Sequence, residues 1–168
     1  MVTAADPVGS VANYSEGMFV GYRWFDRAGI APRFAFGYGL SYSTFGLSGL
    51  SIETAGEPLV VRCTVANTGH VAGATVPQLY LQYPEAANEP LWQLRGFSKV
   101  FLTPGQRTEV TFPLPKRWLS IWDVDAGGWR TPAGRFRFFA GWSSRDPVLS
   151  GNFSRHDEAP TSSAASSR

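Results

Sequence analysis

The side chains that could carry acid–base chemistry in this sequence are a few carboxylates outside the regular hydrophobic patterns. The candidates are Glu16, Asp26, Asp123 and Asp125. Asp123 and Asp125 come directly before Ala126-Gly127-Gly128, and aspartates beside glycines are typical of a turn. A reaction site needs groups that converge in a pocket, which closeness in sequence does not provide. We therefore predict no catalytic residues in this chain.

Metal and redox chemistry have equally few candidate residues. His70 follows the turn Asn67-Thr68-Gly69, and His156 lies in a polar C-terminal segment. Neither histidine has partner ligands at the spacing of a metal site. Cys63 is the only cysteine in the sequence, which excludes a disulfide within the chain. The sequence predicts no metal and no cofactor.

The 6 tryptophans are the candidates for contact with a sugar, because exposed aromatic rings offer broad apolar surfaces. Trp142 continues the alternating apolar row that begins at 136–140, so we expect it in the core, and we expect the same of Trp122. Trp92 lies in a polar loop and Trp129 follows two glycines, which favours exposure. Trp92 and Trp129 are therefore the candidate sugar contacts.

The composition describes one folded domain with no obvious charged partner. The chain has 168 residues, of which 43% are hydrophobic and 14% aromatic, enough for a proper core. Its 15 basic and 13 acidic residues are spread out, which argues against nucleic acid. No apolar run reaches the length of a membrane span, and residues 1–17 do not resemble a signal peptide.

Alternation of apolar and polar residues predicts β-strands through the middle of the chain. In 59–66, for example, Leu59, Val61, Cys63 and Val65 share one side. Strands are expected over 47–52, 59–66, 76–83, 97–102, 108–114, 136–142 and 148–153. Residues 118–123 offer at most one helical turn. This pattern predicts an all-β fold, an immunoglobulin or fibronectin III-like β-sandwich of about seven strands.

The stretch FGYGLSYSTF at 36–45 fits no regular strand, because its bulky residues and its small residues would occupy opposite sides. Glycines permit close backbone approach, and aromatic side chains bury large areas. We expect an irregular connector that lies between two packed bodies.

Several motifs occur in the order known from one enzyme family. They are YSEGMFVGYRWFD (14–26), IAPRFAFGYGLSYSTF (30–45), VANTGHVAGATVPQLYLQYP (65–84), LRGFSKVFLTPGQ (94–106), LSIWD (119–123) and GWSSRD (141–146). Together they resemble the C-terminal region of family 3 glycoside hydrolases of the β-glucosidase type. In that family a barrel and an α/β sandwich precede a fibronectin III-like domain.

The resemblance implies three segments. Residues 1–45 would be a connector and the end of a missing α/β sandwich, 46–154 the fibronectin III-like domain, and 155–168 a disordered polar tail. The family's aspartate nucleophile and glutamate acid/base lie upstream of these motifs. The implied role is therefore structural: the module braces the catalytic domains, and its loop 84–93 borders the active-site mouth. The implied parent reaction is retaining hydrolysis of a β-glucosyl residue.

The implied partners are the α/β sandwich and barrel domains of a parent or split enzyme, with carbohydrate as a further candidate. A run of aromatics with an arginine is typical of a buried joint in a multidomain protein. The predicted interdomain interface comprises Glu16, Phe19, Tyr22, Arg23, Trp24, Phe36, Gly37, Gly39, Leu40, Ser41 and Tyr42.

Two residues depart from the family's usual pattern. Tyr38 stands where a histidine is common, and Pro77 stands where a valine is more frequent. Because proline lacks an N–H group, Pro77 predicts an edge position for that part of its strand.

Two other functions remain open from the residues alone. A free carbohydrate-binding module would need exposed, coplanar aromatics among Trp92, Trp118 and Trp129, and an adhesion or scaffolding sandwich would need a separate partner for the connector. The sequons at Asn13 and Asn152 are candidate glycosylation sites. A typical parent enzyme is secreted, although the chain shows no signal peptide.

Overall fold

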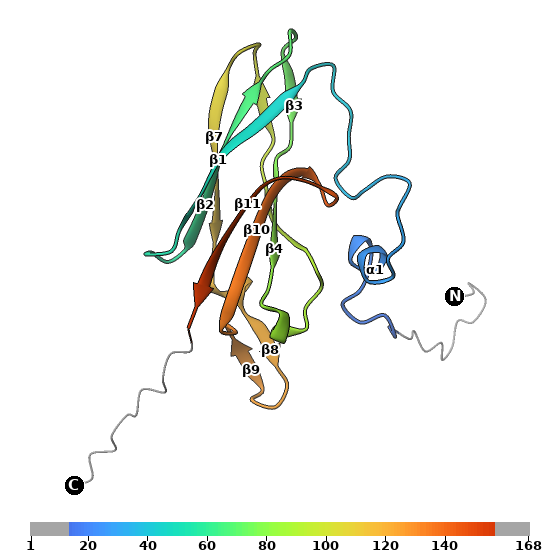
Figure 1. Cartoon of the computed structure of the whole chain (residues 1–168), viewed down its shortest axis with the longest axis vertical. Coiled ribbons are helices and arrows are strands. Elements are labelled where there is room, and N and C mark those ends of the chain that lie inside the picture. Colours follow the sequence, from blue (N-terminus) through green and yellow to red (C-terminus); the bar gives the residue numbers. More distant parts are fainter. Residues whose placement is uncertain (1–13, 157–168) are drawn as a thin grey trace, which may run out of the picture.

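The computed structural model describes residues 14–156, and these form a β-sandwich with a connector along one side (Figure 1). The helical elements are α1 Tyr22–Arg27 and the 3-10 turns Glu85–Ala87 and Lys116–Leu119. The strands are β1 Phe45–Glu53, β2 Leu59–Asn67, β3 Gly73–Thr75, β4 Gln78–Gln82, β5 Gln93–Phe97, β6 Val100–Leu102, β7 Arg107–Leu114, β8 Ile121–Asp123, β9 Gly128–Arg130, β10 Gly134–Ser143 and β11 Asp146–Arg155.

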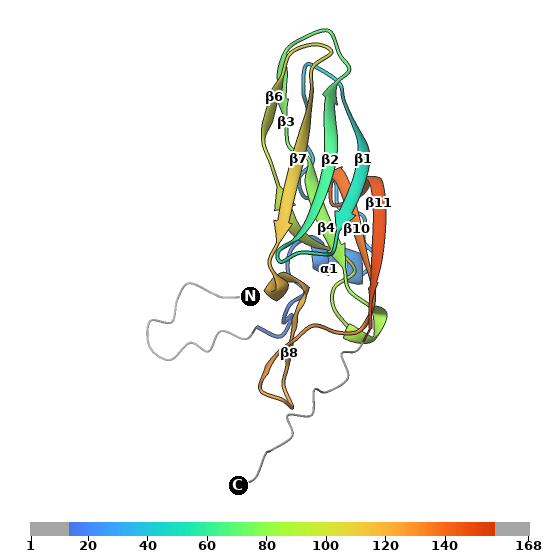
Figure 2. The ribbon, with the colours of Figure 1, turned by 90° about the vertical axis from the view of Figure 1, so that its left-hand side faces the viewer.

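The sandwich has two main antiparallel sheets. One has the order β1-β2-β7 and the other the order β11-β10-β4-β5. Figure 2 shows the first sheet in front of the second. In β2 every second residue is buried, from Leu59 to Asn67, because one side of the strand faces the core and the other does not. The seven strands of these two sheets confirm the predicted all-β, fibronectin III-like fold.

Aromatic and branched apolar side chains fill the space between the two sheets. Phe136, Phe138 and Ala140 are completely buried, as the alternation in β10 predicts. The Phe153 ring of β11 stacks on Phe136 at 5.1 Å and on Phe138 at 6.0 Å between centroids. Trp142 is half-buried and packs against the edge of this cluster, so the row reaches the end of the core there.

A buried asparagine organises the turn that follows β2. Asn67 is 1% exposed. Its Nδ2 donates to the carbonyl oxygens of Val71 and Leu102, both at 2.9 Å, and its Oδ1 accepts the Gly69 N–H at 3.0 Å. Because each polar atom of the amide has a partner, its burial is not costly. The predicted turn at 67–69 is confirmed, and His70 is an exposed residue within it.

The predicted strand over 97–102 was wrong in its bounds. Two short strands replace it, β5 and β6, and they belong to different sheets. The edge position predicted from Pro77 was also wrong, because β4 lies between β10 and β5. Pro77 itself is buried and immediately precedes β4, at the point where the chain leaves the small β3-β6 sheet. A missing N–H is therefore tolerated there.

The expected core position of Trp122 was wrong as well. The single helical turn lies at 116–119, so it overlaps only the start of the stretch 118–123 where at most one turn was expected. β8 and β9 then pair in a small hairpin, with Trp122 opposite Trp129. Trp122 is 52% exposed. In the turn between β8 and β9, Asp123 Oδ1 accepts the Ala126 N–H at 3.0 Å and Oδ2 accepts Arg130 Nε–H at 2.5 Å. A three-residue strand shows too little alternation to be recognised from sequence.

The connector is not entirely irregular, because it contains the helix α1. This helix of 6 residues was not predicted from the sequence, and it has no side-chain cap. Of the predicted tail at 155–168, residues 157–168 lie outside the described residues, as does Asn13, while Arg155 still belongs to β11. Asn152 is exposed on β11, the edge strand of its sheet, and its glycosylation stays a prediction.

Candidate functional site

The connector covers the outer side of the four-stranded sheet. Figure 1 shows α1 and the chain after it beside β4 and β10, on the side away from β2 and β7. In β4, Leu79 and Leu81 belong to the core cluster between the sheets, so Gln78 and Tyr80 point outward. Tyr80 is nevertheless only 3% exposed. The connector is therefore a third layer that buries this outer surface.

Tyr22 of α1 makes the central contact between connector and sheet. Its hydroxyl oxygen accepts the backbone N–H of Leu94 in β5 at 2.9 Å. Its ring stacks on Phe36 at 5.2 Å and meets the Tyr80 ring edge-on at 6.0 Å. Burial raises the pKa of the Tyr80 hydroxyl, and the nearby Tyr22 and Asp26 add to this effect. Tyr80 is thus a neutral, buried phenol beneath the connector.

Gln78 connects the sheet to the glycine-rich stretch. Its Nε2 donates to the carbonyl oxygens of Gly37, at 3.3 Å, and Trp142, at 2.8 Å. Its Oε1 accepts the Tyr80 hydroxyl at 2.5 Å. Gly37 has a φ of +83°, and a Cβ there would overlap the Gln78 amide. Position 37 therefore requires glycine, both for its backbone conformation and for this close approach.

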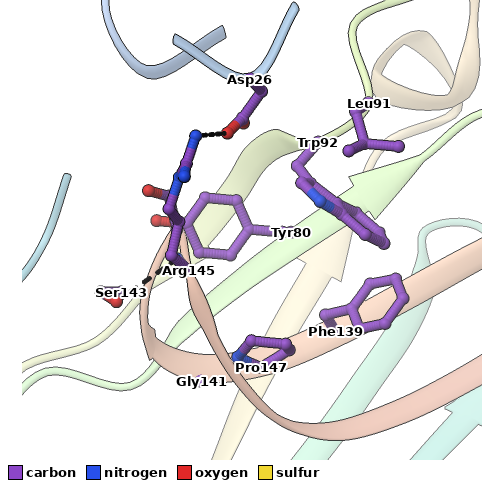
Figure 3. A pocket seen from close by; sticks show the side chains of 10 residues that line it. Asp26, Tyr80, Leu91, Trp92, Phe139, Gly141, Ser143, Arg145 and Pro147 are labelled. Carbon is purple, nitrogen blue, oxygen red and sulfur yellow. Dashed lines mark hydrogen bonds and ion pairs between the residues drawn. The ribbon is translucent and has the colours of Figure 1, made fainter. Parts of the chain in front are cut away.

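An ion pair joins α1 to the turn between β10 and β11. Arg145 Nη2 donates to Asp26 Oδ1 at 2.9 Å and to the Ile30 carbonyl oxygen at 3.0 Å, and Figure 3 shows the first bond. The adjacent Ser144 N–H donates to the Phe36 carbonyl oxygen at 2.9 Å. The Asp26 side chain is 8% exposed, so the pair is screened less than a surface salt bridge.

A cavity of about 430 Å³ lies between this ion pair and the sheet. Figure 3 shows Trp92 and Phe139 on one side of it and Arg145 with Asp26 on the other. Trp92 is half-buried, and its ring meets the Phe139 ring edge-on at 3.9 Å. The ring of Trp92, a candidate sugar contact, thus packs against Phe139, and Trp92 also lines the cavity.

The other candidate sugar contact lies elsewhere in the molecule. Trp129 is 53% exposed in β9, but the Arg117 guanidinium lies 4.7 Å from its ring centre and Trp122 meets it edge-on at 5.5 Å. Trp92 lies in the loop before β5, so the two candidates share no element and no pocket among those described. They do not form one coplanar platform.

The predicted interface residues divide into two sets. Tyr22, Phe36 and Gly37 contact the chain's own sandwich, as described above. Leu40 and Tyr42 point to solvent, and Phe36 is also about half exposed. Together with Phe34 and Tyr38, which were not among the predicted interface residues, they form what we call the apolar ridge, residues 34, 36, 38, 40 and 42. Their exposed fractions are Phe34 64%, Phe36 51%, Tyr38 54%, Leu40 89% and Tyr42 100%.

The remaining predicted interface residues lie on or beside α1 and the ridge. Trp24 is 44% exposed, and Glu16, Gly39 and Ser41 are exposed. Phe19 is half-buried beneath the Arg27 guanidinium, at 4.1 Å from its ring centre. Arg23 is half-buried, and its Nε has no partner within residues 14–156.

Two of the candidate acids form ion pairs, and the other two are exposed. Asp26 is paired with Arg145, and Asp123 with Arg130, while Glu16 and Asp125 are exposed. The Ala126 N–H, and next the Arg130 side chain, hold the pKa of Asp123 below its usual range. A general acid needs a raised pKa, so this carboxyl is unsuited to that role.

Three residues that contact the connector from the sandwich were not predicted as site residues: Gln78, Tyr80 and Arg145. The signal was present, because QLY lies in the quoted block 65–84 and Arg145 in GWSSRD. Within the part of the chain that the structure describes, no cluster of His, Cys, Asp and Glu could hold a metal ion. No helix there has the length and apolarity that crossing a membrane requires.

Comparisons with known proteins agree with the β-sandwich fold and with the family resemblance of the sequence motifs. Residues 75–144 match the family of fibronectin type III-like domains. The chain is 43% identical to probable β-glucosidase D of Aspergillus niger and 45% identical to probable β-glucosidase L of Emericella nidulans. These alignments cover 84% and 85% of this chain but 21% and 22% of the relatives. The chain thus spans about a fifth of the length of the curated relatives it matches.

Solved structures agree with the sequence comparison. The β-D-glucoside glucohydrolase of Trichoderma reesei superposes with a TM-score of 0.83 at 39% identity, over 90% of this chain and 24% of that one. The GH3 β-glucosidase of Bifidobacterium adolescentis gives 0.80 at 38% identity, over 84% and 21%.

The fold defines a class: a fibronectin type III-like β-sandwich module with an attached connector. More particularly, the chain matches the C-terminal region of β-glucosidases of glycoside hydrolase family 3.

Proposed function

We propose that this chain is the bracing module of a family 3 β-glucosidase, and that its apolar ridge docks on the α/β sandwich and barrel domains that complete such an enzyme. The observation that supports this proposal is the exposure of the apolar ridge. Its five side chains, from Phe34 to Tyr42, are each at least half exposed. Several exposed apolar side chains within one short segment favour an interaction site.

The attachment of the connector supports this proposal. A flexible segment would lose conformational freedom on docking, which lowers affinity. Here Tyr22, Gln78 and Arg145 hold both ends of the segment 22–37 on the sheet. The first part of the ridge, Phe34 and Phe36, therefore lies on a segment that is held on the sheet, which lowers the entropy cost of docking there.

The proposed parent reaction is retaining hydrolysis of a terminal β-glucosyl residue, with both catalytic carboxylates supplied by the other domains. The module contributes position only. The loop between β4 and β5, which carries Trp92, is proposed to border the active-site mouth, so that contact of Trp92 with sugar would depend on the assembled enzyme.

A chimera tests the docking proposal. Residues 14–156 replace the matching region in β-glucosidase L of Emericella nidulans, which is 45% identical. We expect the chimera to fold and to hydrolyse a chromogenic β-glucoside, whereas the chain alone gives no turnover above the blank. Tyr42→Ser and Leu40→Ser in the chimera should lower its melting temperature, because each removes a buried anchor of the joint.

The matched control is Phe101→Ser in β6, since Phe101 is 67% exposed and lies outside the connector. Its melting temperature should equal that of the unmodified chimera. A chimera that is inactive although folded, or ridge variants no less stable than the Phe101 control, would contradict the proposal. Turnover by the chain alone that is lost in Asp123→Asn would also contradict it.

A further inference from the structure

The cavity between the connector and the sheet has one apolar wall and one polar wall. Figure 3 shows the rings of Trp92 and Phe139 on one side of it and the Asp26–Arg145 ion pair on the other. Leu91 extends the apolar wall. The volume of about 430 Å³ is within the range of small-ligand sites, which combine apolar surface with a few placed polar groups.

The polar wall has hydrogen-bonding capacity that the protein does not use. Asp26 Oδ1 accepts from Arg145, but Asp26 Oδ2 is buried and has no partner within residues 14–156. The Asp26 side chain as a whole is 8% exposed. A buried oxygen that accepts no hydrogen bond is costly, so a ligand that donates to it removes that cost.

The charges of this wall favour a neutral ligand. Asp26 and Arg145 are the two charged residues that line the cavity, and they neutralise each other. A carboxylate can only accept hydrogen bonds and a guanidinium can only donate them, whereas a hydroxyl does both. A ligand with two adjacent hydroxyls can therefore donate to Asp26 and accept from Arg145 at the same time.

We propose that this cavity binds a neutral sugar ring, with two adjacent hydroxyls on the Asp26–Arg145 pair and the C–H face of the ring against Trp92. An indole offers a broad apolar surface that suits such a face. Its contact with Phe139, edge-on at 3.9 Å, holds the indole in place before the ligand arrives, which lowers the entropy cost of binding.

This site differs from the active-site mouth proposed above, where contact of Trp92 with substrate depends on the other domains. Every group that lines the cavity belongs to this chain, and no residue of the apolar ridge is among them. Sugar binding in the cavity therefore needs no other domain. An inactive chimera would leave this inference intact, and absence of sugar binding would leave the docking proposal intact.

Titration of the full-length chain with methyl β-D-glucopyranoside, followed by heteronuclear NMR, tests the proposal. The indole N–H signal of Trp92, identified by its loss in Trp92→Ala, should shift and reach saturation. Cyclohexanol has a ring of similar size but a single hydroxyl, so it should bind at least about tenfold more weakly.

Two variants test the two walls, with the backbone amide signals of residues 143–145 as the readout. Trp92→Ala should weaken sugar binding at least about tenfold, because it removes the apolar wall. Asp26→Asn keeps an oxygen for Arg145 but replaces the free acceptor with a donor, and it should weaken binding by about the same factor. Amide exchange in α1 checks that the connector stays attached in Asp26→Asn; if it does not, Trp92→Ala and cyclohexanol decide.

The matched control is Trp122→Ala, since Trp122 is 52% exposed in β8 and does not line the cavity. This variant should bind the sugar like the unmodified chain. The proposal would be overturned by the absence of a saturable shift, by equal binding of cyclohexanol, or by equal losses in the two tryptophan variants. Unchanged binding in Asp26→Asn with the connector attached would also overturn it.

Discussion

At the scale of single residues, complementary packing and satisfied polar atoms account for most of the features described. Phe138 is 0% exposed between the sheets, and Asn67 is 1% exposed with partners for its amide atoms. Substitutions there act through a cavity in the first case and through unpaired backbone groups in the second.

Phe138→Ala should lower the free energy of unfolding by about 3 to 5 kcal/mol, because it leaves a cavity beneath the Phe153 ring. Denaturant unfolding measures the change. Val124→Ala is the control, since Val124 is 81% exposed and should change stability by less than about 0.5 kcal/mol. A loss under about 1 kcal/mol for Phe138→Ala would mean that β10 presents its other side to the core.

Cys63 should make the stability of the protein fall at alkaline pH. Burial, and secondarily the charge of Glu109, raises the pKa of the thiol from 9.0 to about 11. The folded state favours the protonated thiol, so this contribution is fully present below the unfolded pKa of 9.0 and is lost as pH rises toward 11. Melting temperatures between pH 8 and 11 should fall more steeply for the unmodified chain than for Cys63→Ala.

The same burial predicts low reactivity of the Cys63 thiol. Iodoacetamide at pH 8.5 should label the native chain far more slowly than the chain in denaturant, because the thiolate is the reacting form. Equal labelling rates in the native and denatured chain would show that the thiol is accessible. If the melting temperatures of the unmodified chain and of Cys63→Ala fall equally with pH, the thiol does not cause the pH dependence.

At the scale of elements, the connector is a layer that depends on a few polar contacts. α1 has no fully buried residue and no side-chain cap, so packing and propensity alone give it little stability. The connector is held on the sandwich by its hydrogen bonds to Arg145, Gln78 and Leu94. We expect it to open more readily than the strands of the sandwich.

Arg145→Gln should accelerate amide hydrogen exchange in α1 by about tenfold or more, because it leaves the buried carboxylate of Asp26 without its charged partner. Exchange in β2 should stay unchanged. Arg137→Gln is the control, since Arg137 is exposed on β10, the strand that precedes the turn carrying Arg145. Equal exchange of α1 in the two variants would mean that the ion pair does not hold the connector.

At the scale of the whole molecule, the sandwich has a core that does not include the connector. Every residue of the buried cluster between the sheets lies at position 47 or beyond. The connector covers the outer surface around Tyr80 instead. The connector and the sandwich should therefore differ in stability, and the sandwich should fold without the connector.

A chain without residues 1–44 should keep a cooperative unfolding transition, with a lower melting temperature because Tyr80 and its neighbours become exposed. Calorimetry measures the transition, and hydrogen exchange in β2 and β10 should retain its protection. Loss of the cooperative transition would show that the connector belongs to the folding unit of the sandwich.

Much of the sandwich could be predicted from the sequence, because a strand that is buried on one side alternates apolar and polar residues. The alternation at 59–66 and at 136–140 follows from one side of each strand being buried, and both rows are confirmed. The ordered motifs likewise identified the family region before any coordinates. The short strands β3, β8 and β9 were missed because three residues carry no readable period.

The candidate sites were decided by the tertiary structure. Asp26 and Arg145 are 119 positions apart, and their contact depends on how α1 returns to the β10–β11 turn. The sequence by itself determined which residues are apolar, charged or flexible, and through their periodicity the strands. Which of them share a surface depends on the chain path, since long-range contacts leave no local pattern.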